Sequence, residues 1–141
     1  MLIDWPQEFD RWLDRLEVEA KNGDQRSQLI YDLVSSELVR LQRLTDPPTP
    51  ETETAMLKWV RQSRRHRVWR VSHPYREGVA VRLICWFPPD SDTVVIALFA
   101  GDKGRIGDVW YDSVGARADA VIDQWLRETA PDDSEESDDG E

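Results

Sequence analysis

Three runs of apolar and β-branched residues decide the fold of this chain: RVWRVSH at residues 67–73, VAVRLICWFPP at 79–89 and TVVIALFAGDKGRIGDVWY at 93–111. Each run contains a segment of strand length, and turn-forming Pro, Gly and Asp residues separate one run from the next. This pattern predicts a small antiparallel sheet with strands at about 67–73, 79–87 and 93–100.

Helical periodicity is found on both sides of these strands. Two amphipathic segments come first, and the turn Asn22, Gly23, Asp24 between them predicts an antiparallel αα-hairpin. The proline-rich linker from Asp46 to Pro50 ends the second segment, because proline cannot continue a helix. We therefore predict a single α+β domain over residues 1–129, in which the N-terminal αα-hairpin packs on a small, mainly antiparallel β-sheet and a C-terminal helix closes the fold. The expected helices are residues 6–20, 25–44, 51–62 and 113–128.

Charge is distributed unevenly along the chain. The 141 residues carry a formal net charge of −10, but residues 131–141 alone contribute seven acidic groups and no basic one. This composition predicts a disordered acidic tail at residues 130–141. Between Lys58 and Arg82, in contrast, eight Lys and Arg residues accompany a single glutamate. Since the local field steers a polyanion, the acidic total does not exclude a nucleic-acid substrate.

Other features indicate the compartment and the absence of a cofactor. Cys85 is the only cysteine and lies inside an apolar run, which predicts an inert core thiol. No apolar run is long enough to span a bilayer, and the amino terminus lacks a signal-peptide pattern, so we expect a cytoplasmic protein with no membrane partner. His66 and His73 have no companions at metal-ligand spacing, so we expect no metal and no cofactor.

Basic side chains alternate with aromatic ones in the middle of the chain. Arginine forks bind phosphate and aromatic faces stack on bases, a combination that suits single-stranded RNA. The alternative interpretation is a solvated, charged loop. The residues predicted to contact RNA are Arg61, Arg64, Arg65, Arg67, Arg105 and Trp110, and the interleaved aromatic residues are Trp59, Trp69 and Tyr75.

Two residues have both a structural and a catalytic interpretation. His73 ends a strand in basic surroundings that favour its neutral form, so it is either a structural histidine or a proton acceptor. Trp110 and Tyr111 precede the last helix and would ordinarily close the core. If Trp110 packs inward, however, Tyr111 points elsewhere and can stack on a base or move a proton. The glycine-rich residues 101–107 match no nucleotide-binding motif and predict a flexible turn that carries basic side chains past the sheet edge.

A family resemblance emerges from the last third of the chain. Gly101, Asp102 and Lys103, followed by Trp110 and Tyr111 and by Ala118 and Asp119, resemble the GDK…WY…AD signature of the HigB-like, phage-derived branch of the RelE/ParE toxin superfamily. The order of helices, proline-rich linker, strands and terminal helix is similar to that superfamily over about residues 5–128.

The resemblance implies a fold, an activity and partners. Members of this branch are usually toxins of type II toxin–antitoxin systems, held inactive by a cognate helix-turn-helix antitoxin. They act as ribosome-dependent mRNA endonucleases and so inhibit translation. The resemblance therefore implies a RelE/ParE-like fold and a metal-independent endoribonuclease (mRNA interferase) that acts on mRNA at the ribosome.

The resemblance also implies roles for individual residues. Arg70 corresponds to a basic residue that faces the RNA, and Arg82 corresponds to the arginine that stabilises the phosphate. Lys103, with Arg105 close by, takes the place of the basic group after the last strand. Tyr111 falls near an aromatic residue that stacks on a base or assists proton transfer. The predicted catalytic residues are Arg70, His73, Arg82, Lys103 and Tyr111.

The superfamily also supplies an alternative. ParE-type members keep the fold, lack the nuclease residues and act on DNA gyrase, so the second expectation is a non-enzymatic RelE/ParE-fold protein that binds gyrase or a phage-related partner. The two expectations differ in whether Arg70, Arg82, Lys103 and Tyr111 converge on one concave surface. Family members also commonly begin with a β-strand, for which the four residues before Trp5 are barely long enough.

Overall fold

The computed structural model describes residues 1–103 and 109–131. Within these residues, five strands form one sheet in the order β1-β5-β4-β3-β2. The strands are β1 (Leu2–Asp4), β2 (Leu57–Trp59), β3 (Trp69–Ser72), β4 (Val81–Trp86) and β5 (Val94–Asp102), and the helices are α1 (Gln7–Lys21), α2 (Gln25–Gln42), α4 (Val109–Asp112) and α5 (Val114–Thr129).

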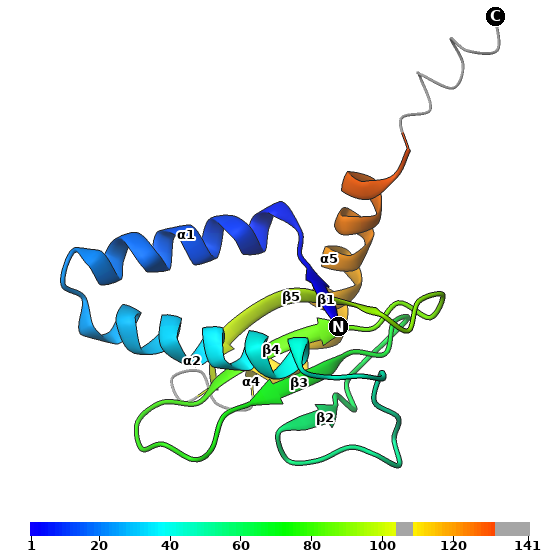
Figure 1. Ribbon diagram of the computed structural model, residues 1–141, viewed down its shortest axis with the longest axis horizontal. Coiled ribbons are helices and arrows are strands. Elements are labelled where there is room, and N and C mark those ends of the chain that lie inside the picture. The colour runs from blue at the N-terminus through cyan, green and yellow to red at the C-terminus, as the bar shows by residue number, and fades with distance from the viewer. Residues whose placement is uncertain (104–108, 132–141) are drawn as a thin grey trace, which may run out of the picture.

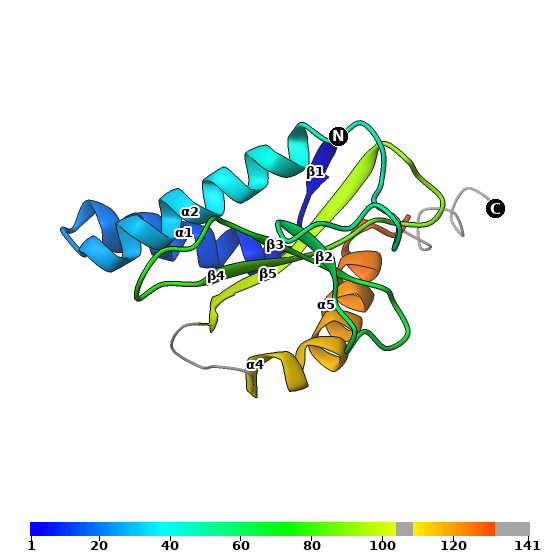
Figure 2. The same cartoon turned by 90° about the horizontal axis from the view of Figure 1, so that it is seen from below.

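Helices lie on both faces of the sheet. Helices α1 and α2 form an antiparallel hairpin on one face, and α4 and α5 lie on the opposite face (Figure 1 and Figure 2). Each face therefore has its own apolar cluster. The cluster on the hairpin side includes Phe9, Val34, Leu41, Val71 and Leu83, and the cluster on the α5 side includes Val68, Ile84, Ile96, Ala118 and Ile122.

The central strands read as continuous apolar runs because both of their faces are buried. In β4, Leu83 and Cys85 belong to the cluster on the hairpin side, whereas Ile84 and Trp86 belong to the cluster on the α5 side. Antiparallel pairing joins β2 to β3, β3 to β4 and β4 to β5, while β1 runs parallel to β5. The fold is thus α+β, and its mixed sheet is mainly antiparallel, as predicted.

The predicted αα-hairpin is confirmed. Helix α1 buries Phe9 and Leu16 against the rest of the fold. Asp24 caps α2, because its carboxylate accepts a hydrogen bond from the backbone N–H of Ser27 at 3.0 Å. Gly23, in the turn before it, has a φ of +98°, which is a backbone conformation that glycine adopts without strain. The final helix and the three predicted strands are also present, with bounds that differ from the predicted ones by a few residues.

The predicted helix at residues 51–62 is wrong. This segment contains turns and the short strand β2, which pairs with β3 so that Leu57 lies opposite Val71 and Trp59 lies opposite Trp69. Its closely spaced apolar residues fit a helix and a strand alike, and the exposed edge of β3 decides between them. The amino terminus, although short, does form a strand at the other edge of the sheet.

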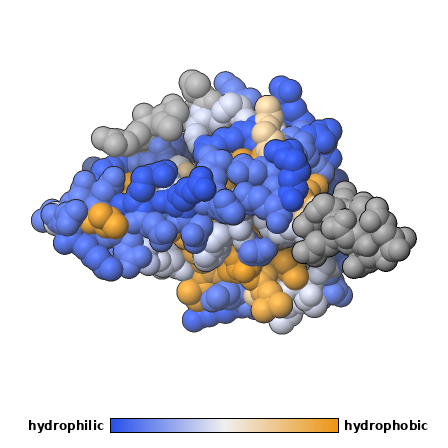
Figure 3. All heavy atoms as spheres, turned by 90° about the horizontal axis from the view of Figure 1, so that it is seen from above, coloured by the Kyte–Doolittle hydropathy of each residue, from blue (hydrophilic) through white to orange (hydrophobic). Residues whose placement is uncertain are grey.

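Two predictions fall on residues outside the described part of the chain. Arg105 lies in the segment 104–108, and nearly all of the acidic tail lies in 132–141. Within the described residues, no helix is long and apolar enough to cross a membrane. Cys85 is fully buried, which confirms the prediction that it lies in the core. Burial also raises the pKa of its thiol. The face seen in Figure 3 is largely hydrophilic, with hydrophobic atoms gathered mainly in one patch.

Candidate functional site

Arg70 is the centre of the candidate site. In β3, Trp69 and Val71 face the helical hairpin, so Arg70 and Ser72 point to the face that carries α4 and α5. The Arg70 guanidinium is half-buried there, and its Nη1 lies 3.5 Å from the Tyr111 hydroxyl and 3.5 Å from the Ser72 hydroxyl. These are long hydrogen bonds, but they place an arginine and a tyrosine from distant parts of the chain side by side.

Trp110 positions Tyr111. Its indole packs over Gly101 in β5 so closely that a Cβ atom at Gly101 would lie 2.9 Å from the indole Nε1. The Trp110 ring meets Phe99 edge-on at a centroid distance of 6.2 Å and Tyr111 at 4.9 Å. Trp110, predicted to contact RNA, is therefore a buried side chain of the core. Tyr111 is half-buried and its ring packs against the same apolar cluster, while its hydroxyl lies near Arg70, so the prediction that Tyr111 points elsewhere is not confirmed.

Lys103 and Arg82 complete a group that we call the cationic cluster, namely Arg70, Arg82, Lys103 and Tyr111. The Lys103 ammonium lies 5.0 Å from the centre of the Tyr111 ring, a distance at which cation–π attraction operates. Arg82 pairs with Ser72 of β3 and with Gly101 of β5. Directly paired residues lie on the same face of a sheet, and Ser72 is two residues from Arg70, so Arg82 lies on the face of Arg70. The structure thus brings Arg70, Lys103 and Tyr111 into contact and places Arg82 on the same face beside them.

Arg82 itself lines a separate small hollow of about 230 Å³, where β3 ends and β4 begins. Its Nη1 donates a hydrogen bond to the carbonyl oxygen of Val81 at 3.1 Å. Its Nε is buried and has no hydrogen-bond partner among the described residues. A buried guanidinium N–H without an acceptor is uncommon and costs free energy.

His73 lines the same hollow, but main-chain groups already occupy both of its ring nitrogens. The backbone N–H of Val81 donates to Nε2 at 3.0 Å, so the ring proton lies on Nδ1, which donates to the carbonyl oxygen of Pro74 at 2.7 Å. This geometry fits the structural interpretation of His73, since neither nitrogen is open to a substrate. A catalytic role for His73 gains no support from these contacts.

Sequence reasoning named Asp102 only as part of the motif and missed its partner Arg26, with which it fixes the end of β5. The Asp102 carboxylate accepts a hydrogen bond from the backbone N–H of Ala80 at 3.0 Å and pairs with the guanidinium of Arg26 at the start of α2. Ser72, which contacts Arg70, was also missed. The alternation of polar and apolar residues along β3 could have identified Ser72, but no local signal links Arg26 to a residue so far along the chain.

The arginine segment, residues 61–67, connects β2 to β3 and packs in part against the start of α5. The guanidinium groups of Arg61 and Arg67 each lie 4.4 Å from the centre of the Trp59 ring. Arg61 also pairs with Glu53 at 2.6 Å, and this hydrogen bond holds the pKa of the Glu53 carboxyl below its usual value. Aromatic and acidic partners within the protein therefore already engage part of this basic segment.

Helix α5 fixes the next part of the segment. The Arg65 guanidinium pairs with Asp123 at 2.6 Å and lowers the pKa of that carboxyl by hydrogen bonding. The Asp119 carboxylate accepts hydrogen bonds from the backbone N–H groups of Arg65 and His66, both at 3.1 Å. Arg64 is also exposed but has no ion-pair partner among the described residues. Of the arginines predicted to contact RNA, Arg61 and Arg65 are thus ion-paired within the protein.

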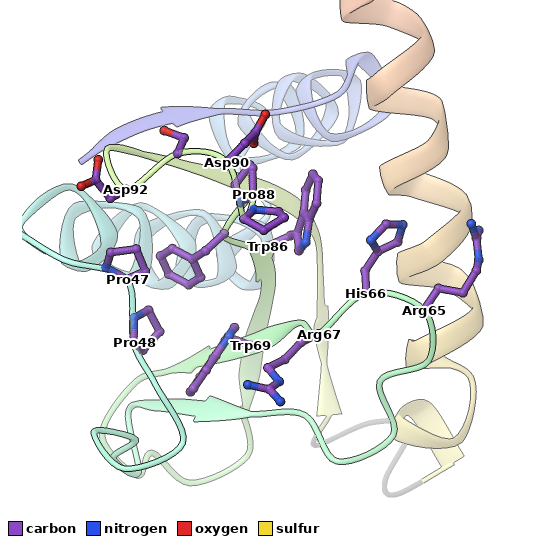
Figure 4. Close-up of a pocket in the computed structure, with 13 residues that line it drawn as sticks. Pro47, Pro48, Arg65, His66, Arg67, Trp69, Trp86, Pro88, Asp90 and Asp92 are labelled. Carbon is purple, nitrogen blue, oxygen red and sulfur yellow. The ribbon is translucent and has the colours of Figure 1, made fainter.

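A groove of about 690 Å³ lies beside the arginine segment (Figure 4). Its lining joins this segment to Trp86 and to Asp90 and Asp92 of the connection between β4 and β5. In Figure 4, Trp86 lies between His66 and the two aspartates. Because carboxylates on its lining repel a polyanion, this groove is a weaker nucleic-acid site than the cationic cluster.

Within residues 1–103 and 109–131, no group of three or more His, Cys, Asp and Glu side chains is arranged to hold a metal ion. The comparison of the chain with family models, with curated proteins and with solved structures finds no significant match. The function proposed below therefore rests on the geometry of the cationic cluster and on the motifs of the sequence.

Proposed function

We propose that this chain is the toxin of a type II toxin–antitoxin pair and that it inhibits translation by cleaving mRNA on the ribosome. The observation that carries the proposal is the contact of Arg70 with Tyr111 beside Lys103, on the sheet face that also carries Arg82. The GDK…WY…AD motif supports it, because Gly101, Trp110 and Tyr111 meet at this site. A RelE/ParE-like arrangement of the helical hairpin, sheet and C-terminal helix is part of the same proposal.

The proposed reaction needs positive charge and a proton donor, which this cluster can supply, and a base for the 2′-hydroxyl proton, for which solvent water serves. The 2′-oxygen of a ribose attacks the adjacent phosphorus, so that a bond from phosphorus to the 2′-oxygen forms while the bond to the 5′-oxygen breaks. The 2′-hydroxyl loses its proton to a base, and the departing 5′-oxygen gains one. Negative charge grows on the phosphorane oxygens, and each preorganised cationic donor near them contributes on the order of 3 kcal/mol to catalysis.

Each member of the cluster has a part in this mechanism. Arg70 and Lys103 supply positive charge beside Tyr111, and the half-buried guanidinium of Arg82 supplies a further positive charge for a phosphate oxygen. The Tyr111 oxygen accepts a hydrogen bond from Arg70, so its own proton points elsewhere. In this mechanism Tyr111 donates that proton to the 5′-oxygen, and no metal ion takes part.

The test in cells is induced expression in a bacterium, followed by mapping of mRNA 5′ ends. We expect growth arrest and new 5′ ends with the wild type, and the loss of both with Arg82→Ala. Arg11→Ala is the matched control, because Arg11 is an exposed arginine on α1. Arrest without new 5′ ends would favour the non-enzymatic alternative, in which the chain binds gyrase or another partner.

The antitoxin is the partner that this function requires. Co-expression of an adjacently encoded helix-turn-helix protein should prevent the arrest and co-purify with the chain. Failure of every such neighbour to relieve the arrest would argue against a two-component system while leaving the nuclease assay unaffected.

A further inference from the structure

The connection between β3 and β4 presents an aromatic side chain to solvent. Tyr75 is 93% exposed. Arg76 and Val79 form a β-bridge across the tip, and Gly78 turns the chain with a φ of +79°. Packing does not explain a tyrosine at this position, because its ring contributes almost nothing to either apolar cluster.

The hollow beside Tyr75 is the one that Arg82 lines. Its lining consists of His73, Tyr75, Arg76, Gly78, Val79, Ala80 and Arg82, and none of these described residues carries a carboxylate. The hollow thus combines two guanidinium groups with one aromatic face. Its volume of about 230 Å³ is below the 300–1,000 Å³ of pockets that enclose whole small molecules. A phosphate and part of a sugar fit there, whereas a base would have to lie outside.

The charge of Arg82 is not cancelled from the other face of the sheet. Glu37 on α2 lies near Arg82, but burial outweighs the influence of that arginine and raises the pKa of Glu37 to about 9. At neutral pH this carboxyl is therefore protonated and carries no charge. The guanidinium of Arg82 thus lines the hollow and has no ion-pair partner among the described residues.

We infer that this hollow binds a nucleotide of single-stranded RNA next to the cleaved phosphate. A phosphate oxygen of that nucleotide contacts Arg82 and Arg76, and its base stacks on the exposed ring of Tyr75. Since every base has a π-face, this stacking tolerates any base. The inference rests on the proposed function, and it adds a binding subsite on the tip between β3 and β4, which we call the tip subsite.

The binding experiment uses a short, fluorescently labelled RNA whose 2′-O-methyl groups prevent cleavage, titrated with the purified chain in an anisotropy assay. Loss of one base stack weakens affinity by roughly 5- to 150-fold, so we expect that effect for Tyr75→Ala. Tyr75→Phe keeps the ring face and should bind within roughly two-fold of the wild type. Tyr75 is exposed, so neither change threatens the fold.

Salt dependence separates stacking from phosphate contact. Arg76→Gln should reduce the slope of log affinity against log salt concentration by roughly 0.7, the value for one phosphate contact on a single strand. Tyr75→Ala should leave that slope unchanged, because stacking releases no counterion. Wild-type affinity in Tyr75→Ala, or no measurable RNA binding by the wild type, would overturn the tip subsite.

The tip subsite and the proposed function fail in different ways. A wild type that binds RNA in a Tyr75-dependent manner but cleaves nothing on ribosomes would refute the nuclease and support the tip subsite. A wild type that cleaves, with Tyr75→Ala binding and cleaving equally well, would refute the tip subsite alone.

Discussion

Glu37 makes the stability of this protein strongly dependent on pH. Its side chain lies on the buried face of α2, with 1% of its surface exposed, and neither carboxyl oxygen has a hydrogen-bond partner among the described residues. Burial raises the pKa of this carboxyl from 4.5 to about 9, and the nearby charges of Arg82 and Arg40 offset only part of that effect. The folded chain therefore keeps a proton that the unfolded chain loses.

The sign of the effect follows from this difference in proton binding. Below the unfolded pKa of 4.5 both states are protonated, and the stabilising contribution is fully present. As the pH rises toward the folded pKa of about 9, only the unfolded state gains by releasing its proton. Each pH unit in this window lowers the free energy of unfolding by about 1.4 kcal/mol, or on the order of 4 kcal/mol between about pH 5 and pH 8. That loss is large beside a typical domain stability of about 5–15 kcal/mol.

Glu37→Gln tests this reasoning, because glutamine has nearly the same shape and does not titrate. Urea unfolding followed by tryptophan fluorescence at several pH values gives the free energies. We expect the two proteins to be similar near pH 5 and the variant to be more stable by on the order of 4 kcal/mol near pH 8. Asp32→Asn, an exposed carboxylate on the same helix, is the control and should show no such divergence. A difference between wild type and Glu37→Gln that stays constant from about pH 5 to pH 8 would refute the reasoning.

Three further predictions concern buried residues. Gly115→Ala should lower the free energy of unfolding by about 1–3 kcal/mol, because its Cβ would lie 2.1 Å from the carbonyl oxygen of Gln62; unchanged urea unfolding would contradict this. Asp119→Ala should lower the free energy of unfolding by about 1–3 kcal/mol, because the backbone N–H groups of residues 65–66 lose their acceptor. Asp119→Asn should have a stability between those of the wild type and Asp119→Ala. Cys85 should react with a thiol reagent only as fast as the protein opens, whereas rapid labelling of the native state would contradict its burial.

The fold was largely predictable because its main signals are local. The apolar runs around Val71, Leu83 and Leu98 have strand length and strand composition, and helical periodicity marked the two-helix hairpin and α5. Strand β2 was missed because the spacing of its apolar residues fits the period of a helix as well as that of a strand. Only its pairing with β3 determines which conformation forms. Such pairing is tertiary information that a local pattern lacks.

The candidate site was less predictable than the fold. The family resemblance suggested that Arg70, Lys103 and Tyr111 belong together, but their proximity depends on how Trp110 packs over Gly101. The arginine segment looked like an open basic surface in the sequence. Its acidic partners are mostly on α5, more than fifty residues away, and no local pattern connects them.

The most direct test of the proposed nuclease is a cleavage assay with purified chain and translating ribosomes, comparing wild type with Tyr111→Phe. This variant loses only the hydroxyl that contacts Arg70 and keeps the ring that packs against Trp110. We predict that wild type cuts mRNA, leaving a cyclic phosphate, and that Tyr111→Phe cuts about 10²- to 10⁴-fold more slowly. Cleavage by Tyr111→Phe at the wild-type rate, or no cleavage by folded wild type, would contradict the proposal.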